Sequence, residues 1–148
     1  MYKKILVALE NSPADECLLA QVRELARHLG SRLVLVHVAE GWAARNYSQL
    51  TLAESEEMKQ DREYLEKVAQ DLRAAGLAVD TLLGAGDPSK ELLETIHRER
   101  CDLVAMAGHG HRGLADLFFG SVISEVRHKS TVPLLLVRTP KPGAAAGA

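Results

Sequence analysis

Glycines, histidines and an arginine gather in one segment of this 148-residue sequence, and together these residue types suit the binding of an anion. The segment, residues 107–122, reads A-G-H-G-H-R-G-L-A-D-L-F-F-G-S-V and follows an apolar run at residues 102–106 that predicts a buried strand. Glycines allow backbone N–H groups to approach a ligand closely. The pair Gly120-Ser121 stands where we expect a helix to begin, and a helix N-terminus adds unpaired N–H groups and a positive dipole end. We therefore predict a phosphate site, with a glycine-rich connection that binds nothing as the alternative.

The same segment also matches the dinucleotide fingerprint G-x-G-x-x-G, at Gly108, Gly110 and Gly113. That fingerprint requires a helix that opens at its last glycine and an acidic residue about twenty positions further on, at the end of the next strand. Here it follows the fourth predicted strand instead of the first, and the sequence leaves no room for a further βαβ unit. We expect no NAD site.

Apolar runs and helical patterns alternate along the chain. Strands are predicted at residues 4–9, 32–39, 77–83, 102–106 and 134–138, and helices at residues 13–29, 52–75, from 88 onward and at 121–129. Ser12 and Asp87 are the expected N-caps of the first and third helices, each followed by a proline, and Asp15 is expected to return a bond to the first cap. Gly30 is the expected C-cap of the first helix.

This alternation predicts an α/β protein, a three-layer sandwich around a doubly wound, parallel, five-stranded sheet of order 3-2-1-4-5. In that order the winding reverses between strands one and four, and such folds bind ligands at the carboxyl ends of the strands beside the reversal. The segments there are residues 9–12 and those from Met106 onward. The fold therefore leads to the glycine segment independently of its composition.

The composition, with 47% hydrophobic and 26% charged residues and a net charge of −2, is that of an ordinary globular domain. We predict one domain at residues 1–138 and a flexible tail at 139–148. The charge provides no general attraction for nucleic acid or an anionic membrane, and we find neither a membrane span nor a signal peptide, so we expect a cytoplasmic protein. Cys17 and Cys101 are expected to be buried and reduced.

Five stretches resemble the universal stress protein family, over nearly the whole chain. K-I-L-V-A-L-E-N-S-P resembles the family's first strand and loop, L-V-H-V its second strand, G-D-P its third turn and S-T-V-P-L-L-L-V-R its last strand. The most specific likeness is to the family's nucleotide motif. Ala107-Gly108-His109-Gly110, nine further residues and then Gly120-Ser121 lie in register with it.

The resemblance implies an adenine nucleotide alpha hydrolase-like fold that binds ATP, AMP or ADP, with Mg²⁺ or Mn²⁺ carried by the phosphates. It places the phosphates at Gly110, Gly120 and Ser121, the adenine near Val38 and Met106, and the ribose near Glu10. The implied nucleotide contacts are Ala8, Leu9, Glu10, Val38, Met106, Ala107, Gly108, His109, Gly110, His111, Arg112, Gly120, Ser121 and Val122.

Two residues depart from the family pattern. Ala107 replaces the motif's first glycine, and its methyl group is harmless if its φ is negative but strained if its φ must be positive. Glu10 replaces an aspartate and is one methylene longer, which shifts any hydrogen bond to the ribose or base. Neither change removes the glycines and the serine that the phosphates need.

Several polar residues have alternative roles. His109 and His111 could ligate a metal, but no third ligand is evident nearby, and we place His111 and Arg112 at the γ-phosphate instead. The alternative for Arg112 is a solvent-exposed loop charge. We expect His37 to be a hydrogen-bonded core histidine, and the charged face of the helix at residues 52–75 to be a solvated surface.

No G-x-S-x-G elbow and no Walker motif is present, so we expect at most slow ATP hydrolysis and no defined enzyme activity. The leading hypothesis is a stress-response protein whose nucleotide occupancy acts as a signal. The alternative is a nucleotide-free homodimeric interaction module of the same fold. Its dimer would pair the apolar residues 132–137, which begin with Val132 and end with Val137, with their symmetry mates.

Overall fold

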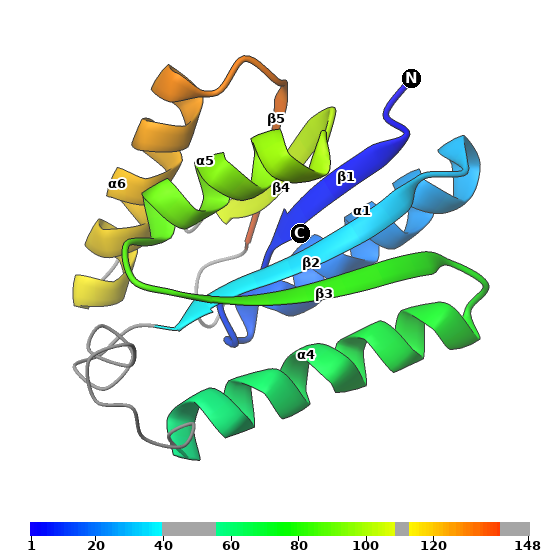
Figure 1. Cartoon of the computed structure of the whole chain (residues 1–148), viewed down its shortest axis with the longest axis horizontal. Helices are drawn as coiled ribbons and strands as arrows, with labels where there is room; N and C mark the ends of the chain where they lie inside the picture. Colours follow the sequence, from blue (N-terminus) through cyan, green and yellow to red (C-terminus); the bar gives the residue numbers. More distant parts are fainter. Residues whose placement is uncertain (40–55, 109–112, 140–148) are drawn as a thin grey trace.

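The computed structural model describes residues 1–39, 56–108 and 113–139, and for residues 113–119 it describes the backbone alone. Within these ranges, parallel strands alternate with helices, as predicted (Figure 1). The elements are β1 (Lys4–Ala8), α1 (Ala14–Leu29), β2 (Arg32–Ala39), α4 (Glu56–Ala74), β3 (Ala78–Ala85), α5 (Pro88–Glu99), β4 (Leu103–Gly108), α6 (Gly113–Lys129) and β5 (Leu134–Arg138).

The sheet has the predicted order, β3-β2-β1-β4-β5, and every pairing in it is parallel. β1 pairs with β2 on one side, where Val7 lies opposite Leu35, and with β4 on the other, where Val7 lies opposite Ala105. The direction of winding therefore reverses between β1 and β4. This confirms the predicted fold class and puts a topological switch point at their carboxyl ends.

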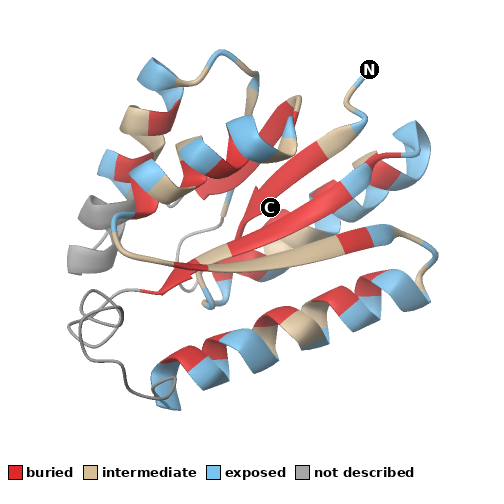
Figure 2. Cartoon of the chain, viewed as in Figure 1, coloured by how far each residue is buried: buried red, intermediate tan, exposed pale blue. Residues whose placement is uncertain are grey.

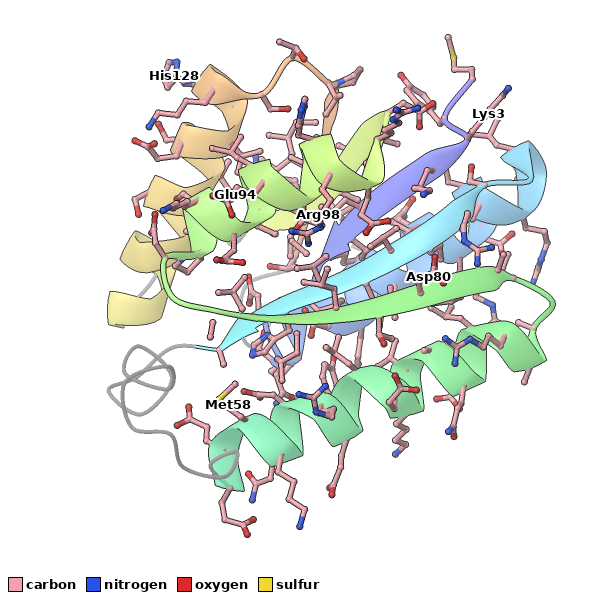
Figure 3. The ribbon with its side chains drawn as sticks, viewed as in Figure 1. Lys3, Met58, Asp80, Glu94, Arg98 and His128 are labelled. Atoms are coloured by element: carbon pink, nitrogen blue, oxygen red, sulfur yellow. The ribbon has the colours of Figure 1, made fainter. Side chains whose placement is uncertain are left out.

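Each face of the sheet carries its own hydrophobic core. Alternate residues of β1 divide between the two: Ile5 and Val7 pack with α1 and α4, whereas Leu6 packs with α5 and α6. Figure 2 shows the result, a buried central sheet between helices whose outer faces are exposed. At the end of β2, Met58 of α4 reaches toward the sheet and packs against Ala39 (Figure 3). This three-layer packing fixes the carboxyl ends of the strands.

The helix caps match the prediction in part. Asp87 caps α5 by accepting a hydrogen bond from the Lys90 N–H, as expected. The N-cap position of α1 is assigned to Pro13, which makes no side-chain cap bond, but Ser12 still makes the bond expected of the predicted cap, because its Oγ accepts from the Ala14 N–H at 3.3 Å. Asp15 does not return a bond to Ser12 because its carboxylate is engaged by the loop that precedes the helix.

The start of α6 also differs from the prediction. The helix begins at Gly113 instead of Ser121, so Gly120 and Ser121 lie inside it. Residues 114–119, L-A-D-L-F-F, contain good helix formers and no proline. A single internal glycine lowers helix stability by only about 1 kcal/mol, which did not end the helix here. Inside a helix, backbone N–H groups pair with carbonyls four residues earlier, so the orphan N–H groups expected at residues 120 and 121 belong to the turn that begins at Gly113.

A helix that opens at Gly113 also meets one requirement of the dinucleotide fingerprint. The fingerprint's other requirement, an acidic residue at the end of the next strand, is not met, because β5 (Leu134–Arg138) contains none; the motif also follows β4 instead of the first strand. The expectation that no NAD site is present therefore rests on the topology and on the missing acidic residue.

The last described residue, Thr139, follows β5. Thr139 is still attached, because its N–H donates to the Gly108 carbonyl at 3.2 Å; residues 140–148 lie outside the described residues. Cys17 and Cys101 are both free thiols, half-buried and buried respectively, and burial raises the pKa of Cys101 to about 11. No helix in the described ranges is long and apolar enough to cross a bilayer.

Candidate functional site

A cavity of about 380 Å³ opens at the carboxyl ends of β1 and β4, where the winding reverses. This volume lies within the range of about 300–1,000 Å³ that is typical of small-molecule sites. Half of the fourteen residues proposed from the sequence line it. They are Ala8, Leu9, Glu10, Val38, Met106, Ala107 and Val122.

The floor of the cavity is apolar. Ala8, Val38, Met106 and Val122 are buried and belong to the core between the sheet and the helices α5 and α6. Met106 is only 2% exposed. A floor built from short aliphatic side chains and one methionine suits a flat apolar group such as a heteroaromatic ring.

Ala107 and Gly108 both belong to β4, where Ala107 lies opposite Val137 and Gly108 opposite Arg138. Ala107 is not among the described residues with positive φ, so its methyl group causes no backbone strain. Ala107 therefore replaces the motif's first glycine without strain, as expected for a residue with negative φ.

Gly108 is explained by packing. A Cβ added at this position would lie 2.8 Å from Cγ of Leu136, a separation too short for two carbon atoms. A glycine at 108 therefore allows Leu136 of β5 to lie across β4. Gly108 is absent from the described cavity lining, and so are Gly120 and Ser121, which precede the lining residue Val122 in α6.

The remaining predicted contacts, His109, Gly110, His111 and Arg112, lie outside the described residues. The roles proposed for them at the phosphates, and the metal alternative for the two histidines, stay predictions. Within the described ranges, no three His, Cys, Asp or Glu side chains are grouped as metal ligands.

The opposite wall of the cavity comes from α4, which the sequence reasoning missed. Glu57 and Gln60 are exposed at the rim, while Asp61 is only 6% exposed. A signal was present in the sequence: Asp61 stands between Met58 and Leu65 on the apolar stripe of the helix. A carboxylate on a buried stripe requires partners, and those partners are what ties α4 to the site.

Asp61 joins two residues of the cavity. Its Oδ1 accepts a hydrogen bond from Nδ2 of Asn11 at 3.0 Å, and its Oδ2 lies 3.3 Å from Nε2 of His37. Nδ1 of His37 lies 2.9 Å from the Leu9 carbonyl oxygen. Since a carbonyl only accepts, Nδ1 carries the hydrogen of that bond. The prediction that His37 is hydrogen-bonded is confirmed, but its assignment to the core was wrong, because His37 is half-buried and lines the cavity.

Glu10 lies at the rim, on the loop that follows β1. Its carboxylate accepts a hydrogen bond from the Ser12 hydroxyl at 2.8 Å, and its own N–H donates to Oδ1 of Asp15 at 3.0 Å. The next residue, Asn11, has a φ of 62°, in the left-handed region. The loop thus turns sharply at the mouth of the cavity. The other lining residues that the sequence did not single out are Val36, Pro88 and Leu92.

The geometry is that of a doubly wound α/β protein with a small-molecule cavity at its switch point, apolar at the floor and polar at the rim. Residues 1–138 match the Usp family, the universal stress protein family. The chain belongs to that family.

Relatives match over nearly their full lengths. The universal stress protein Sll1388 of Synechocystis is 29% identical over 93% of this chain and 98% of its own. The universal stress protein MJ0577 of Methanocaldococcus jannaschii is 28% identical over 93% and 96%. A solved structure of MJ0577 superimposes with a TM-score of 0.80 at 25% identity, over 95% of this chain and 99% of that one.

Two other solved universal stress proteins share the fold and carry ligands. One is in complex with cAMP, with a TM-score of 0.67 at 18% identity over 94% of this chain and 98% of its own. The other, from Archaeoglobus fulgidus, is in complex with dAMP, with a TM-score of 0.68 at 20% identity over 92% and 98%.

Proposed function

We propose that this protein binds an adenine nucleotide, ATP or its relatives ADP and AMP, in the cavity at the ends of β1 and β4. The observation that carries the proposal is the coincidence of an apolar floor, a polar rim and the topological switch point in one cavity. Family membership supports it, as do the cAMP and dAMP complexes of two proteins with this fold.

In the proposed pose the adenine lies on the floor between Val38 and Met106, near the backbone of Ala8 and Leu9. The carboxylate of Glu10 accepts a hydrogen bond from the ribose or the base. Carboxylates along Glu10 and α4 repel phosphates, so the phosphates extend the other way, past Ala107 toward residues 109–112 and the start of α6.

The phosphate contacts are then the N–H groups near Gly110 and in the first turn of α6, with Arg112 as a bidentate donor. The Ser121 hydroxyl, next to the lining residue Val122, remains part of the proposal, because a side-chain hydroxyl can donate from within a helix. Mg²⁺ or Mn²⁺ would arrive with the nucleotide and be held mainly by phosphate oxygens.

We propose that occupancy of this site is a regulatory signal in a cytoplasmic stress response, with ATP hydrolysis slow at most. Calorimetric titration with ATP and Mg²⁺ tests the binding step. We expect saturable heat with a Kd below about 1 mM and a rise in melting temperature that grows with ligand concentration. An absence of both at millimolar nucleotide would contradict the proposal.

The exposed edge of the sheet supports a second proposal, a homodimer through the last strand. Within the described chain β5 pairs only with β4, and Leu136 of β5 is 41% exposed. An apolar edge strand of this kind is stabilised by pairing with a second copy. Light scattering of the protein and of Leu136→Glu measures this: we expect a dimer that the charged variant weakens, and a monomeric wild type would refute it.

The two proposals are compatible, but a dimeric module without nucleotide is a separate function. Analysis of small molecules released from the denatured protein distinguishes them. Bound adenine nucleotide favours the first proposal, whereas a dimer that releases none and binds none in the titration favours the second.

A further inference from the structure

Asp15, near the start of α1, is 1% exposed, and its carboxylate is the centre of a hydrogen-bond cluster. It accepts bonds from the N–H groups of Glu10 at 3.0 Å and Asn11 at 2.9 Å, and from the Tyr64 hydroxyl. Two of these donors are backbone groups of the loop at the cavity mouth, and the third comes from α4. The carboxylate thereby fixes the loop against two helices at once.

A second connection runs in parallel. Asp61, three residues before Tyr64 in α4, accepts from the Asn11 side chain and contacts His37, which holds the Leu9 carbonyl. Residues three apart in a helix lie on the same face, so Asp61 and Tyr64 hold residues 9–11 from one surface of α4. Asp15 therefore binds backbone N–H groups of the loop, and Asp61 binds the side chain of Asn11 in the same loop.

We propose that Asp15 and Tyr64 are positioning residues: they hold Glu10 and Asn11 in the geometry that accepts the nucleoside half of the ligand, and so couple the docking of α4 to occupancy of the cavity. This inference rests on the proposed nucleotide site. Neither residue lines the described cavity, so they act through the loop. Affinity falls in proportion to the fraction of molecules whose loop has the binding geometry.

Tyr64 is suited to this role at any ordinary pH. Burial, together with the neighbouring Asp15 carboxylate, raises the pKa of Tyr64 far above its usual range. The hydroxyl therefore stays protonated and donates a hydrogen bond to the Asp15 carboxylate.

The test is Tyr64→Phe, which removes one hydroxyl and keeps the ring. We expect the affinities for adenosine, AMP and Mg-ATP all to fall by the same factor, about fivefold or more, because the loop faces the nucleoside that the three ligands share. Hydrogen exchange adds a second measurement. Ligand should slow exchange in the first turns of α4 in the wild type and less so in the variant.

Val68→Ala is the matched control. Val68 is a partly buried core residue one turn further along α4, and its truncation destabilises the helix without touching the cluster. We expect the control to lower the melting temperature and leave all three affinities within twofold of wild type. Asp15→Asn, which keeps the shape of the side chain but loses an acceptor, should reduce affinity in the same uniform way and by more.

Three results would overturn the inference. Tyr64→Phe could bind all three ligands within twofold of wild type, its loss could grow with the number of phosphates, or Val68→Ala could lose as much affinity as Tyr64→Phe. If wild type itself binds none of the three ligands, the proposed function fails and the inference fails with it. If wild type binds and Tyr64→Phe binds equally well, only the inference fails.

Discussion

The two walls of the cavity are built on different principles. On the side of α4 and the loop after β1, the contacts are hydrogen bonds among buried or half-buried polar groups centred on Asp15 and Asp61. On the side of β4 and α6, the described lining is apolar, with Met106 and Val122 in one buried cluster, and behind this lining Gly108 packs closely beneath Leu136 of β5.

The comparison shows that a sequence motif can mark the correct place in the fold even when its residues have a different role from the one expected. The glycine motif indicates the right end of the right strand, yet its best described member, Gly108, is required by packing. The polar chemistry lies on the other wall, partly on a helix whose charges suggested a solvated face. Polar groups that must stay paired hold their wall in one geometry, whereas an apolar wall tolerates small shifts.

The largest effect is expected on the polar wall, from Asp15→Ala. The variant leaves two backbone N–H groups and the Tyr64 hydroxyl without their acceptor. We expect urea unfolding to show a loss of about 3 kcal/mol or more in the free energy of unfolding. Glu16→Ala, at the exposed neighbouring position, should change it by less than about 0.5 kcal/mol. A loss below about 1 kcal/mol for Asp15→Ala would show that this wall is not held by its carboxylate.

A smaller loss in the free energy of unfolding is expected behind the apolar wall, from Gly108→Ala. The added methyl group meets Leu136, which is partly exposed and able to move aside. We expect the free energy of unfolding to fall by about 1–2 kcal/mol, and Leu136→Ala in the same chain to restore part of the loss. Strictly additive effects of the two changes in thermal unfolding would disprove the packing explanation.

The variant Arg112→Ala tests the prediction from the sequence that the segment between β4 and α6 binds the phosphates. Arg112 lies outside the described residues, and its proposed partner is the terminal phosphate. We expect ATP affinity to fall about tenfold, with adenosine affinity unchanged, because only ATP carries that phosphate. Calorimetric titration of both ligands measures this. If the variant lost the same affinity for ATP as for adenosine, Arg112 would not be a phosphate contact.

The smallest effect is expected far from both walls, at the ion pair between Arg32 and Asp80 (Asp80 is labelled in Figure 3). The hydrogen bond from Arg32 lowers the pKa of Asp80 below its ordinary 3.8. A carboxyl with a lowered folded-state pKa stabilises the fold above its unfolded pKa, and the contribution disappears as the pH falls through the folded value. Asp80→Asn should therefore lower the urea midpoint slightly at pH 7, and the gap should narrow below about pH 4. If the difference in urea midpoint between wild type and Asp80→Asn grew as the pH fell, the pKa of Asp80 would not be lowered in the folded protein.

Much of the fold could be predicted because it follows from local patterns. Apolar runs separated by amphipathic helices specify a parallel sheet, and the handedness of the crossovers limits its order. Doubly wound sheets bind ligands at the carboxyl ends of the strands beside the reversal of winding, and this rule correctly placed Leu9, Met106 and Ala107 at the cavity. The start of α6 could not be predicted in this way. The pair Gly120-Ser121 looks the same in the sequence whether it begins a helix or lies inside one, and in the structure it lies inside α6.

The α4 wall could not be predicted for a different reason. Asp61 is fifty residues from Asn11 and Tyr64 is forty-nine from Asp15 in the sequence, and only the packing of α4 against the sheet brings them together. The prediction that the charged side chains of this helix form a solvated face was wrong for Asp61, which is 6% exposed and lies on the buried stripe. Nothing in the sequence indicated that its partners would lie at the mouth of the cavity.

The central claim is that adenine lies on the apolar floor between β1 and β4, and methyl NMR of the labelled wild-type protein during ATP titration tests it most directly. We predict saturable shifts for the methyl groups of Val38, Met106 and Val122, and none for Val79 at the other end of the sheet. Shifts that spare the three floor residues, or no shifts at saturating ATP, would contradict the account.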